Sequence, residues 1–308
     1  ENLEIEVPVM FRNVDPAIGE FLYPVYVIPA EVSMVAKKPV LLNTNSRSNA
    51  GQQGSNENDP PFMHVLSYEH IPTLIYFSKN EQMVVKVDLK TTGKKIGYIV
   101  GAGDKVPAAI EMMGYELIEL GKNDITSDRL KNLDAVVVGV RAYNVNEWMD
   151  EKYDVLMDYV KNGGNMVVQY NTNSFAGPLS KLKIGPKPFT VSRGRITEED
   201  CEVKFIDEKD PVLNFPNKIT SEDFKGWVQE RGIYFADAFS ADYRAVFSMH
   251  DQNESDLNGS LIVRNEGKGR FIYTGLVFYR ELPAGVPGAF RLFANLISNP
   301  NLKVNEIK

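Results

Sequence analysis

Polar side chains that could bind or react with a ligand follow four apolar segments of this sequence. Gly101 and Asp104 follow the apolar run at residues 96–100, and Arg141 follows the run at 134–140. Further candidates after these and later segments are Tyr143, Asn144, Asn171, Asn173 and Arg280. Ligands bind beyond the carboxyl ends of the strands in open α/β sheets. We therefore predict one polar cleft, whose amides, hydroxyls and two arginines suit a carbohydrate or another small polar or anionic ligand.

A fifth segment, residues 227–232, places a large aromatic ring, an amide and two opposite charges close together. One interpretation is structural, with an ion pair between Glu230 and Arg231 packed beneath Trp227. The other makes the segment a wall of the cleft, with the indole of Trp227 stacking on a sugar ring. On the second interpretation Trp227 and Glu230 belong to the candidate site.

Catalytic chemistry has no clear support in the sequence. A nucleophile elbow needs Ser or Cys in a glycine-rich turn after a strand, whereas the turn at residues 169–173 reads QYNTN. The single cysteine, Cys201, lies well outside that turn and is interpreted as a packing thiol. We therefore assign no catalytic residue.

Metal and cofactor sites are not predicted either. The three histidines lack the spacing of a metal-ligand set. The turn Gly101-Ala102-Gly103-Asp104 could be taken for a dinucleotide-binding turn, but Val106 stands where the third glycine of that motif is required. The sequence therefore predicts no metal and no cofactor.

The elements that must position the candidate site begin at residue 94. An apolar strand at 96–100, a helix at 106–113 and a strand at 115–120 form a strand–helix–strand unit. Strands at 134–140 and 165–170, a helix at 146–162 and a closing helix at 288–298 continue the alternation, and short β segments are expected at 201–206 and 227–233. Such alternation predicts an α/β fold, a flavodoxin-like parallel sheet with helices on both faces.

The first 92 residues have a different character. Their short alternating segments indicate a smaller β-rich region, resembling a partial sandwich, and residues 43–61 are rich in Asn, Gly, Ser and Gln, as expected of a mobile loop. We therefore predict two domains, a β-rich region at 1–92 and an α/β domain at 93–308.

Composition narrows the class of partner. The chain has 308 residues and a formal net charge of −7, without basic clusters, which argues against nucleic acid. No apolar run approaches the roughly 18 residues of a membrane helix, so no membrane span is expected. Because the chain begins at Glu1, we interpret it as a processed or trimmed piece of a longer protein.

Several stretches together resemble the C-terminal portion of PIG-L/LmbE-type deacetylase proteins of Bacteroidetes, which is similar to class I glutamine amidotransferase-like domains. They are KKIGYI with GAGD, VVVGVRAYN, YVKNGG with VVQYNTN, GWVQERG and YTGLVFYRELPAGVPGAFRLFANLIS. The resemblance implies an exported, periplasmic protein acting near N-acetylated glycans beside a deacetylase catalytic domain. The zinc-binding motif of that catalytic domain is absent from this sequence.

Three functional hypotheses follow. The leading one is a non-catalytic accessory module that presents a polar cleft to carbohydrate or to a deacetylase domain. The second is a hydrolase of amidotransferase-like fold that uses Arg141, Asn171 or Glu230 in place of a cysteine. The third is a structural spacer.

Overall fold

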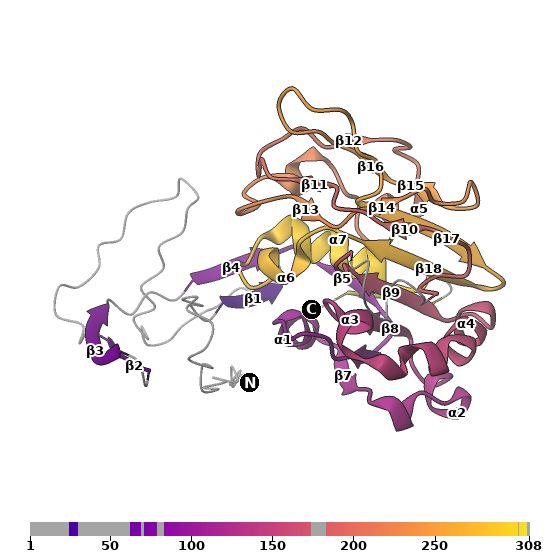
Figure 1. The fold of residues 1–308 in the computed structure, drawn as a ribbon, viewed down its shortest axis with the longest axis horizontal. Coiled ribbons are helices and arrows are strands. Elements are labelled where there is room, and N and C mark those ends of the chain that lie inside the picture. Colours follow the sequence, from indigo (N-terminus) through magenta and orange to yellow (C-terminus); the bar gives the residue numbers. More distant parts are fainter. Residues whose placement is uncertain are drawn as a thin grey trace, which may run out of the picture. The chain divides into compact units, whose positions relative to one another are not determined.

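The computed structural model describes residues 25–29, 62–68, 71–78, 83–173, 183–300 and 302–306. The chain forms two compact units, one of residues 1–24 with 38–83 and one of residues 25–37 with 84–308 (Figure 1). In the first unit β2 (Phe62–Tyr68) and β3 (Ile71–Ser78) pair as an antiparallel hairpin. The predicted loop at 43–61 and the predicted strand at 3–10 lie outside the described residues.

A seven-stranded sheet organises the second unit. Its strand order is β15-β17-β18-β9-β8-β6-β7. The bounds are β6 (Lys95–Ile99), β7 (Glu116–Glu119), β8 (Ala135–Val138), β9 (Asn165–Gln169), β15 (Arg244–Ala245), β17 (Leu261–Glu266) and β18 (Gly269–Thr274). The strands β7, β6, β8, β9 and β18 run parallel, whereas β17 is antiparallel to both of its neighbours. In chain order the parallel part reads 2-1-3-4-5, which is the flavodoxin-like order.

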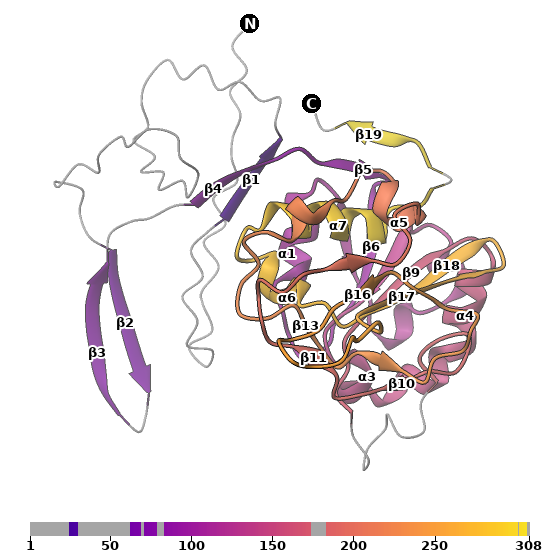
Figure 2. The same ribbon diagram turned by 90° about the horizontal axis from the view of Figure 1, so that it is seen from above.

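Helices cover both faces of this sheet. The α-helices are α1 (Val106–Met112), α2 (Ser127–Leu130), α3 (Ala142–Val145), α4 (Tyr153–Lys161), α5 (Pro211–Asn214), α6 (Phe278–Glu281) and α7 (Pro287–Ile297). Short 3-10 helices are η1 (Lys122–Asp124), η2 (Glu147–Lys152) and η4 (Ser221–Phe224). In both views α1 and α7 lie on one side of the sheet and α4 lies on the other (Figure 1, Figure 2).

The sequence explains this double layer. The side chains of β8 are buried throughout, as expected for a strand covered on both faces. Val137 packs in the core cluster that contains the buried residues of α1 and α7, whereas Val136 and Val138 pack in the cluster that contains those of α2 and α4. Successive side chains of a strand point to opposite faces, so the valines of β8 pack in both core clusters. The α/β prediction, with a smaller β-rich region before it, is confirmed.

The long connection from β9 to β18 forms a layer of short antiparallel pairs. They are β10 (Thr190–Val191) with β14 (Ala236–Asp237), β11 (Arg195–Ile196) with β13 (Gly232–Ile233), and β12 (Lys204–Phe205) with β16 (Phe247–Ser248). Gly232 also bridges to Leu276, just beyond the end of β18. This bridge holds the segment that follows β13 against the carboxyl end of the sheet.

Three expected elements differ from the structure. The single helix expected at 146–162 is divided into η2 and α4 at Lys152/Tyr153. Asn146, expected to begin it, is extended, and its side-chain amide donates to the carbonyl of Val100 at 2.7 Å. Of the β segments expected at 201–206 and 227–233, only Lys204–Phe205 and Gly232–Ile233 form strands. The remainder of both segments has no strand assignment.

The boundary between the units also differs from residue 92. The strand β4 (Met83–Val87) pairs with β1 (Val25–Pro29), and β5 (Lys90–Thr92) pairs with β19 (Val304–Glu306). Val87 and Leu89 are buried in the core cluster of α1 and α7. Residues 84–92 therefore belong to the α/β unit by their packing.

Candidate functional site

The loops after β6 and β8 meet closely at the carboxyl end of the sheet. A side chain at Gly101 would lie 2.0 Å from the carbonyl oxygen of Val140, so only glycine fits there. The amide of Ala102 donates to that carbonyl at 2.8 Å. Gly101 thus shapes the rim, and no side chain is available at this position to contact a ligand.

Asp104 ties the same two loops together. Its carboxylate accepts hydrogen bonds from the hydroxyl of Tyr98 at 2.7 and 2.8 Å and from the amides of Val106 and Val140 at 2.9 and 3.3 Å. Burial raises the pKa of Asp104, although these hydrogen bonds act in the opposite direction. The amide of Gln169 donates to the Tyr98 hydroxyl at 3.3 Å. Asp104 is therefore a positioning residue beneath the rim.

Two asparagines join α3 to the loop after β9. Asn144 accepts from the amide of Thr172 at 2.9 Å and donates to its carbonyl at 3.2 Å. Asn171 accepts from the amide of Tyr143 at 3.0 Å and donates to the carbonyl of Gln169 at 3.0 Å. The predicted neighbourhood of these residues is therefore present, but their amides bond mainly to backbone groups.

Three predicted ligand contacts are buried instead. Tyr143 and Trp227 are 1% and 3% exposed and Asn171 is fully buried, so none of them can offer a surface to a ligand. The indole of Trp227 stacks on Phe224 with centroids 5.3 Å apart, and its N–H donates to the carbonyl of Asp223. The structural interpretation of this segment is closer to the observed packing than the interpretation as a cleft wall. The predicted ion pair between Glu230 and Arg231 is not formed, because Arg231 lies against the Trp227 ring and Glu230 forms an ion pair with Arg280.

Arg141 begins α3 in a left-handed conformation, with φ 58° and ψ 21°. Its backbone is held by a hydrogen bond from its amide to the carbonyl of Tyr170 at 2.9 Å, while its side chain is exposed. Arg141, Gln229 and Tyr234 are three of the five non-glycine residues with positive φ in the described part of the chain. Such strain gathers at functional sites. The turn at 170–173, where a nucleophile elbow was considered, contains no residue with positive φ.

A row of three tyrosines, Tyr279–Tyr170–Tyr234, forms the centre of this region; we call it the tyrosine row. The ring centroids of Tyr170 and Tyr234 are 5.7 Å apart with planes at 14°, and those of Tyr170 and Tyr279 are 5.3 Å apart. All three side chains are half-buried. Burial raises the pKa of Tyr170, and the positive charges of Arg141 and Arg280 act to lower it.

Arg280 adjoins the row at Tyr279. Its guanidinium lies 5.0 Å from the centre of the Tyr279 ring, and its Nε donates to the Tyr279 hydroxyl at 3.0 Å and to Glu230 Oε1 at 3.2 Å. Arg280 is thus partly neutralised by Glu230. In contrast, no carboxylate of the described residues forms an ion pair with Arg141.

A pocket of about 290 Å³ lies at the other end of the row. It is lined by Arg193, Arg195, Ile233 and Tyr234. The strand pair β11–β13 places Arg195 opposite Ile233. Both arginine side chains are exposed, so the pocket opens to solvent with two cations at its edge.

Five residues of this region were not predicted from the sequence, namely Tyr170, Tyr234, Tyr279, Arg193 and Arg195. Tyr170 directly follows β9 and Tyr279 lies in the polar segment after β18, so the strand-end rule could have found both. Arg193, Arg195 and Tyr234 lie in the long connection, where no sequence pattern indicates their approach to the sheet edge.

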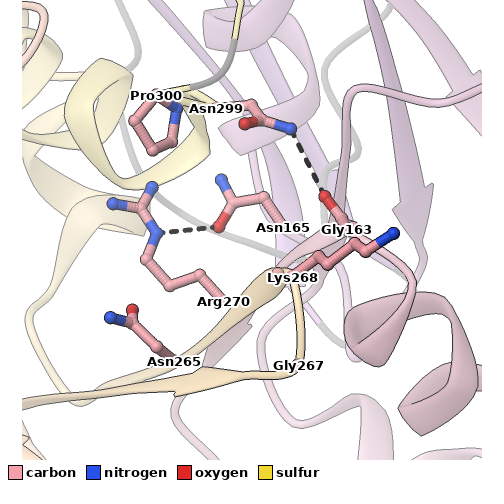
Figure 3. Close-up of a pocket in the computed structure, with 10 residues that line it drawn as sticks. Gly163, Asn165, Asn265, Gly267, Lys268, Arg270, Asn299 and Pro300 are labelled. Atoms are coloured by element: carbon pink, nitrogen blue, oxygen red, sulfur yellow. Dashed lines mark hydrogen bonds between the residues drawn. The ribbon is translucent and has the colours of Figure 1, made fainter.

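A second pocket, of about 230 Å³, lies at the amino ends of β9 and β18. Figure 3 shows the hydrogen bond from Arg270 to Asn165 in this pocket, with Lys268 on the neighbouring turn. Arg270 is buried and also donates to the carbonyls of Asn295, Leu296 and Ser298 at the end of α7. Its guanidinium therefore caps a helix, and we assign this pocket a structural role.

Among the described residues, no group of three His, Cys, Asp or Glu side chains could hold a metal ion. Cys201 is a buried free thiol whose pKa is raised by burial. Within the same residues, every helix is too short or too polar to cross a bilayer.

Comparisons with known proteins give distant likenesses. No family model matches the chain, and no curated protein matches it. The chain is similar to the structure of a cytoplasmic protein from Salmonella typhimurium, with 13% identity, a TM-score of 0.43, and coverage of 77% of this chain and 94% of that one. A structure described as ThuA-like, from Bacteroides uniformis ATCC 8492, has 15% identity, a TM-score of 0.41, and coverage of 68% and 95%.

A third similar structure, from Thermoplasma acidophilum, is described as part of a GMP synthase. It has 12% identity, a TM-score of 0.41, and coverage of 66% of this chain and 92% of that one. Because no family model and no curated protein matches the chain, the resemblance to PIG-L/LmbE-type proteins stays a prediction. The fold assignment itself rests on the strand order and the two core layers.

Proposed function

We propose that this chain is a binding module that holds an acidic, sugar-like ligand at the carboxyl end of its sheet, with Arg141 as the main anchor. The observation that carries the proposal is the state of Arg141. Its backbone is fixed by a hydrogen bond to Tyr170, and its guanidinium is exposed without an ion-pair partner among the described residues. A fixed planar donor suits a carboxylate or phosphate.

The neighbours of Arg141 favour a ring that carries hydroxyl groups. Tyr170, whose carbonyl holds the Arg141 amide, and Tyr279, which packs on Tyr170, contribute two half-buried phenol groups. Arg280 with Glu230 adds a paired donor and acceptor. Asn173 is half-buried after β9 and could supply an amide. Aromatic bodies with polar tips are suited to sites that are apolar at one side and wet at the other.

Association with a deacetylase domain in an exported protein is a second part of the proposal, supported by the sequence resemblance alone. Its test is co-purification of this chain with a separately expressed PIG-L/LmbE-type catalytic domain. A 1:1 complex would support the accessory role. Two independent species in size-exclusion chromatography at micromolar concentration would contradict it.

The direct test of the binding proposal compares D-galacturonate with D-galactose by calorimetric titration. The two sugars differ only in the carboxylate, so we expect binding of the acid and at least tenfold weaker binding of the neutral sugar. Arg141→Ala keeps a Cβ at the left-handed position, so backbone strain is unchanged and only the guanidinium is lost. Losing one charge-assisted hydrogen bond costs about 1.5–3 kcal/mol, roughly tenfold to hundredfold in affinity.

Lys268→Ala is the control, because it removes an exposed cation from the pocket at the opposite edge of the sheet. We expect this variant to bind like the wild type. Equal binding of both sugars, or loss of binding in Lys268→Ala but not in Arg141→Ala, would refute the proposed site.

A further inference from the structure

The pocket beside β11 has no role in the function proposed above. Arg195 lines it from β11 and Arg193 from the residues just before β11, and both side chains are exposed. Neither forms an ion pair with a carboxylate of the described residues. Two adjacent exposed arginines concentrate positive charge around one hollow. The charge of Asp251 offsets part of that of Arg195, and an anionic ligand would offset it further.

Tyr234 connects this pocket with Arg141. It lines the pocket and stacks on Tyr170, whose backbone carbonyl accepts from the amide of Arg141 at 2.9 Å. Its position is enforced by the backbone: Tyr234 has φ 57°, and its carbonyl accepts from the hydroxyl of Tyr273 at 2.7 Å. The same hydroxyl lies 3.5 Å from the amide of Asn171, after β9. The pocket is therefore tied to the sheet edge through one tyrosine.

We propose that Arg193 and Arg195 form a second anionic subsite, and that the ligand is an acidic oligosaccharide that spans the tyrosine row from Arg141 to this pocket. The inference rests on the proposed function and specifies its ligand as a chain with at least two charged units. One unit would pair with Arg141, and a later unit would enter the pocket between Arg193, Arg195 and Tyr234.

A single-stranded nucleic acid is the rival polyanion, and the site suits it less well. Such ligands need free aromatic faces and a continuous basic groove. Here both tyrosine pairs are packed against each other within the row, with Arg280 over Tyr279. The whole chain also carries a net charge of −7, which opposes a long polyphosphate.

The experiment titrates the full chain with galacturonate oligomers of one, two, three and four units. For the wild type we expect affinity to rise at least tenfold between the single unit and the length that reaches the second subsite, and to fall with added NaCl because ion pairs are screened. The double variant Arg193→Ala/Arg195→Ala should bind the single unit as the wild type does. Its affinity should not rise with the length of the oligomer.

The matched control is Arg129→Ala/Lys131→Ala, which removes two exposed cations near α2 and should leave the gain intact. Loss of the gain in the arginine pair alone supports the second subsite. A gain that survives in Arg193→Ala/Arg195→Ala overturns it while leaving the Arg141 site valid. Tighter binding of a dT oligonucleotide than of the tetramer would also overturn it in favour of a nucleic-acid ligand.

Discussion

The ring of Tyr234 lies nearly parallel to the ring of Tyr170, with centroids 5.7 Å apart. Tyr170 directly follows a central parallel strand, and Tyr234 follows β13 in the long connection. The contact joins the inserted layer to the functional edge of the sheet. Because Tyr234 also lines the pocket of Arg193 and Arg195, this one stacking contact links the two groups of arginines.

Two substitutions at Tyr234 distinguish the contribution of its ring to stability from the cost of its left-handed backbone. Tyr234→Ala keeps a Cβ at φ 57° and removes the stacking partner, whereas Tyr234→Gly removes the ring and the strain together. A left-handed conformation costs a residue with a Cβ about 1–2 kcal/mol. We therefore expect the glycine variant to have the larger free energy of unfolding of the two.

Both Tyr234 variants should bind galacturonate oligomers at least tenfold more weakly than the wild type. Denaturant unfolding and calorimetric titration measure the two effects. If alanine and glycine variants are equally stable, the backbone is not strained at this position. If both bind as tightly as the wild type, the tyrosine row has no part in the site.

The Asp104–Tyr98 pair should act as one unit beneath the rim. Asp104→Asn replaces one accepting oxygen with an amide, and Tyr98→Phe removes the hydroxyl that donates to both oxygens. A hydrogen bond to a charged group contributes about 1.5–3 kcal/mol, so we expect each variant to lower the free energy of unfolding by roughly that amount. The double variant should cost less than the two single changes added. Strict additivity in denaturant titration would show that the two groups do not interact.

Four of the five parallel strands were predicted, at 96–100, 115–120, 134–140 and 165–170. Central strands among them carry continuous apolar runs, such as the one at β8. Arg141 was also found, since a side chain directly after such a strand reaches the sheet edge. The split of the helix expected at 146–162 was not foreseen, because no Gly or Pro marks it in the sequence.

Burial of the candidate residues was harder to predict than their location. Trp227 stands among polar residues, yet it packs on Phe224 and is buried, because the inserted layer brings its own aromatic cluster. The roles of Arg193, Arg195 and Tyr234 depend on how short strands without periodic pattern fold back on the sheet. Local sequence carries no signal for such long-range contacts.

Glu281 should give the protein a measurable pH dependence. It is fully buried in α6, and burial raises its pKa from 4.5 to about 8, although the amide of Val228, which donates to it, and the charge of Arg231 act in the opposite direction. The folded state therefore favours the protonated form. Its contribution to stability is fully present below about pH 4.5 and is lost as the pH rises through about 8.

Glu281→Gln tests this linkage, because glutamine is neutral at every pH and keeps an acceptor for Val228. One pKa unit corresponds to about 1.4 kcal/mol. Between pH 5 and 8 the free energy of unfolding of the variant should therefore rise relative to that of the wild type by at most about 4 kcal/mol. Urea denaturation at several pH values measures the difference. A constant difference across this range would contradict a raised pKa.

Hydrogen–deuterium exchange with and without a galacturonate tetramer tests most directly whether the carboxyl end of the sheet is the binding site. We predict slower exchange at residues 139–145, 170–173, 193–196, 232–235 and 276–280, which carry Arg141, the tyrosine row and the arginine pocket. Residues 163–165 and 265–270, around the pocket at the opposite edge, should exchange at an unchanged rate. Protection confined to 163–165 and 265–270 would contradict the account, because it would place the ligand at the amino ends of the strands.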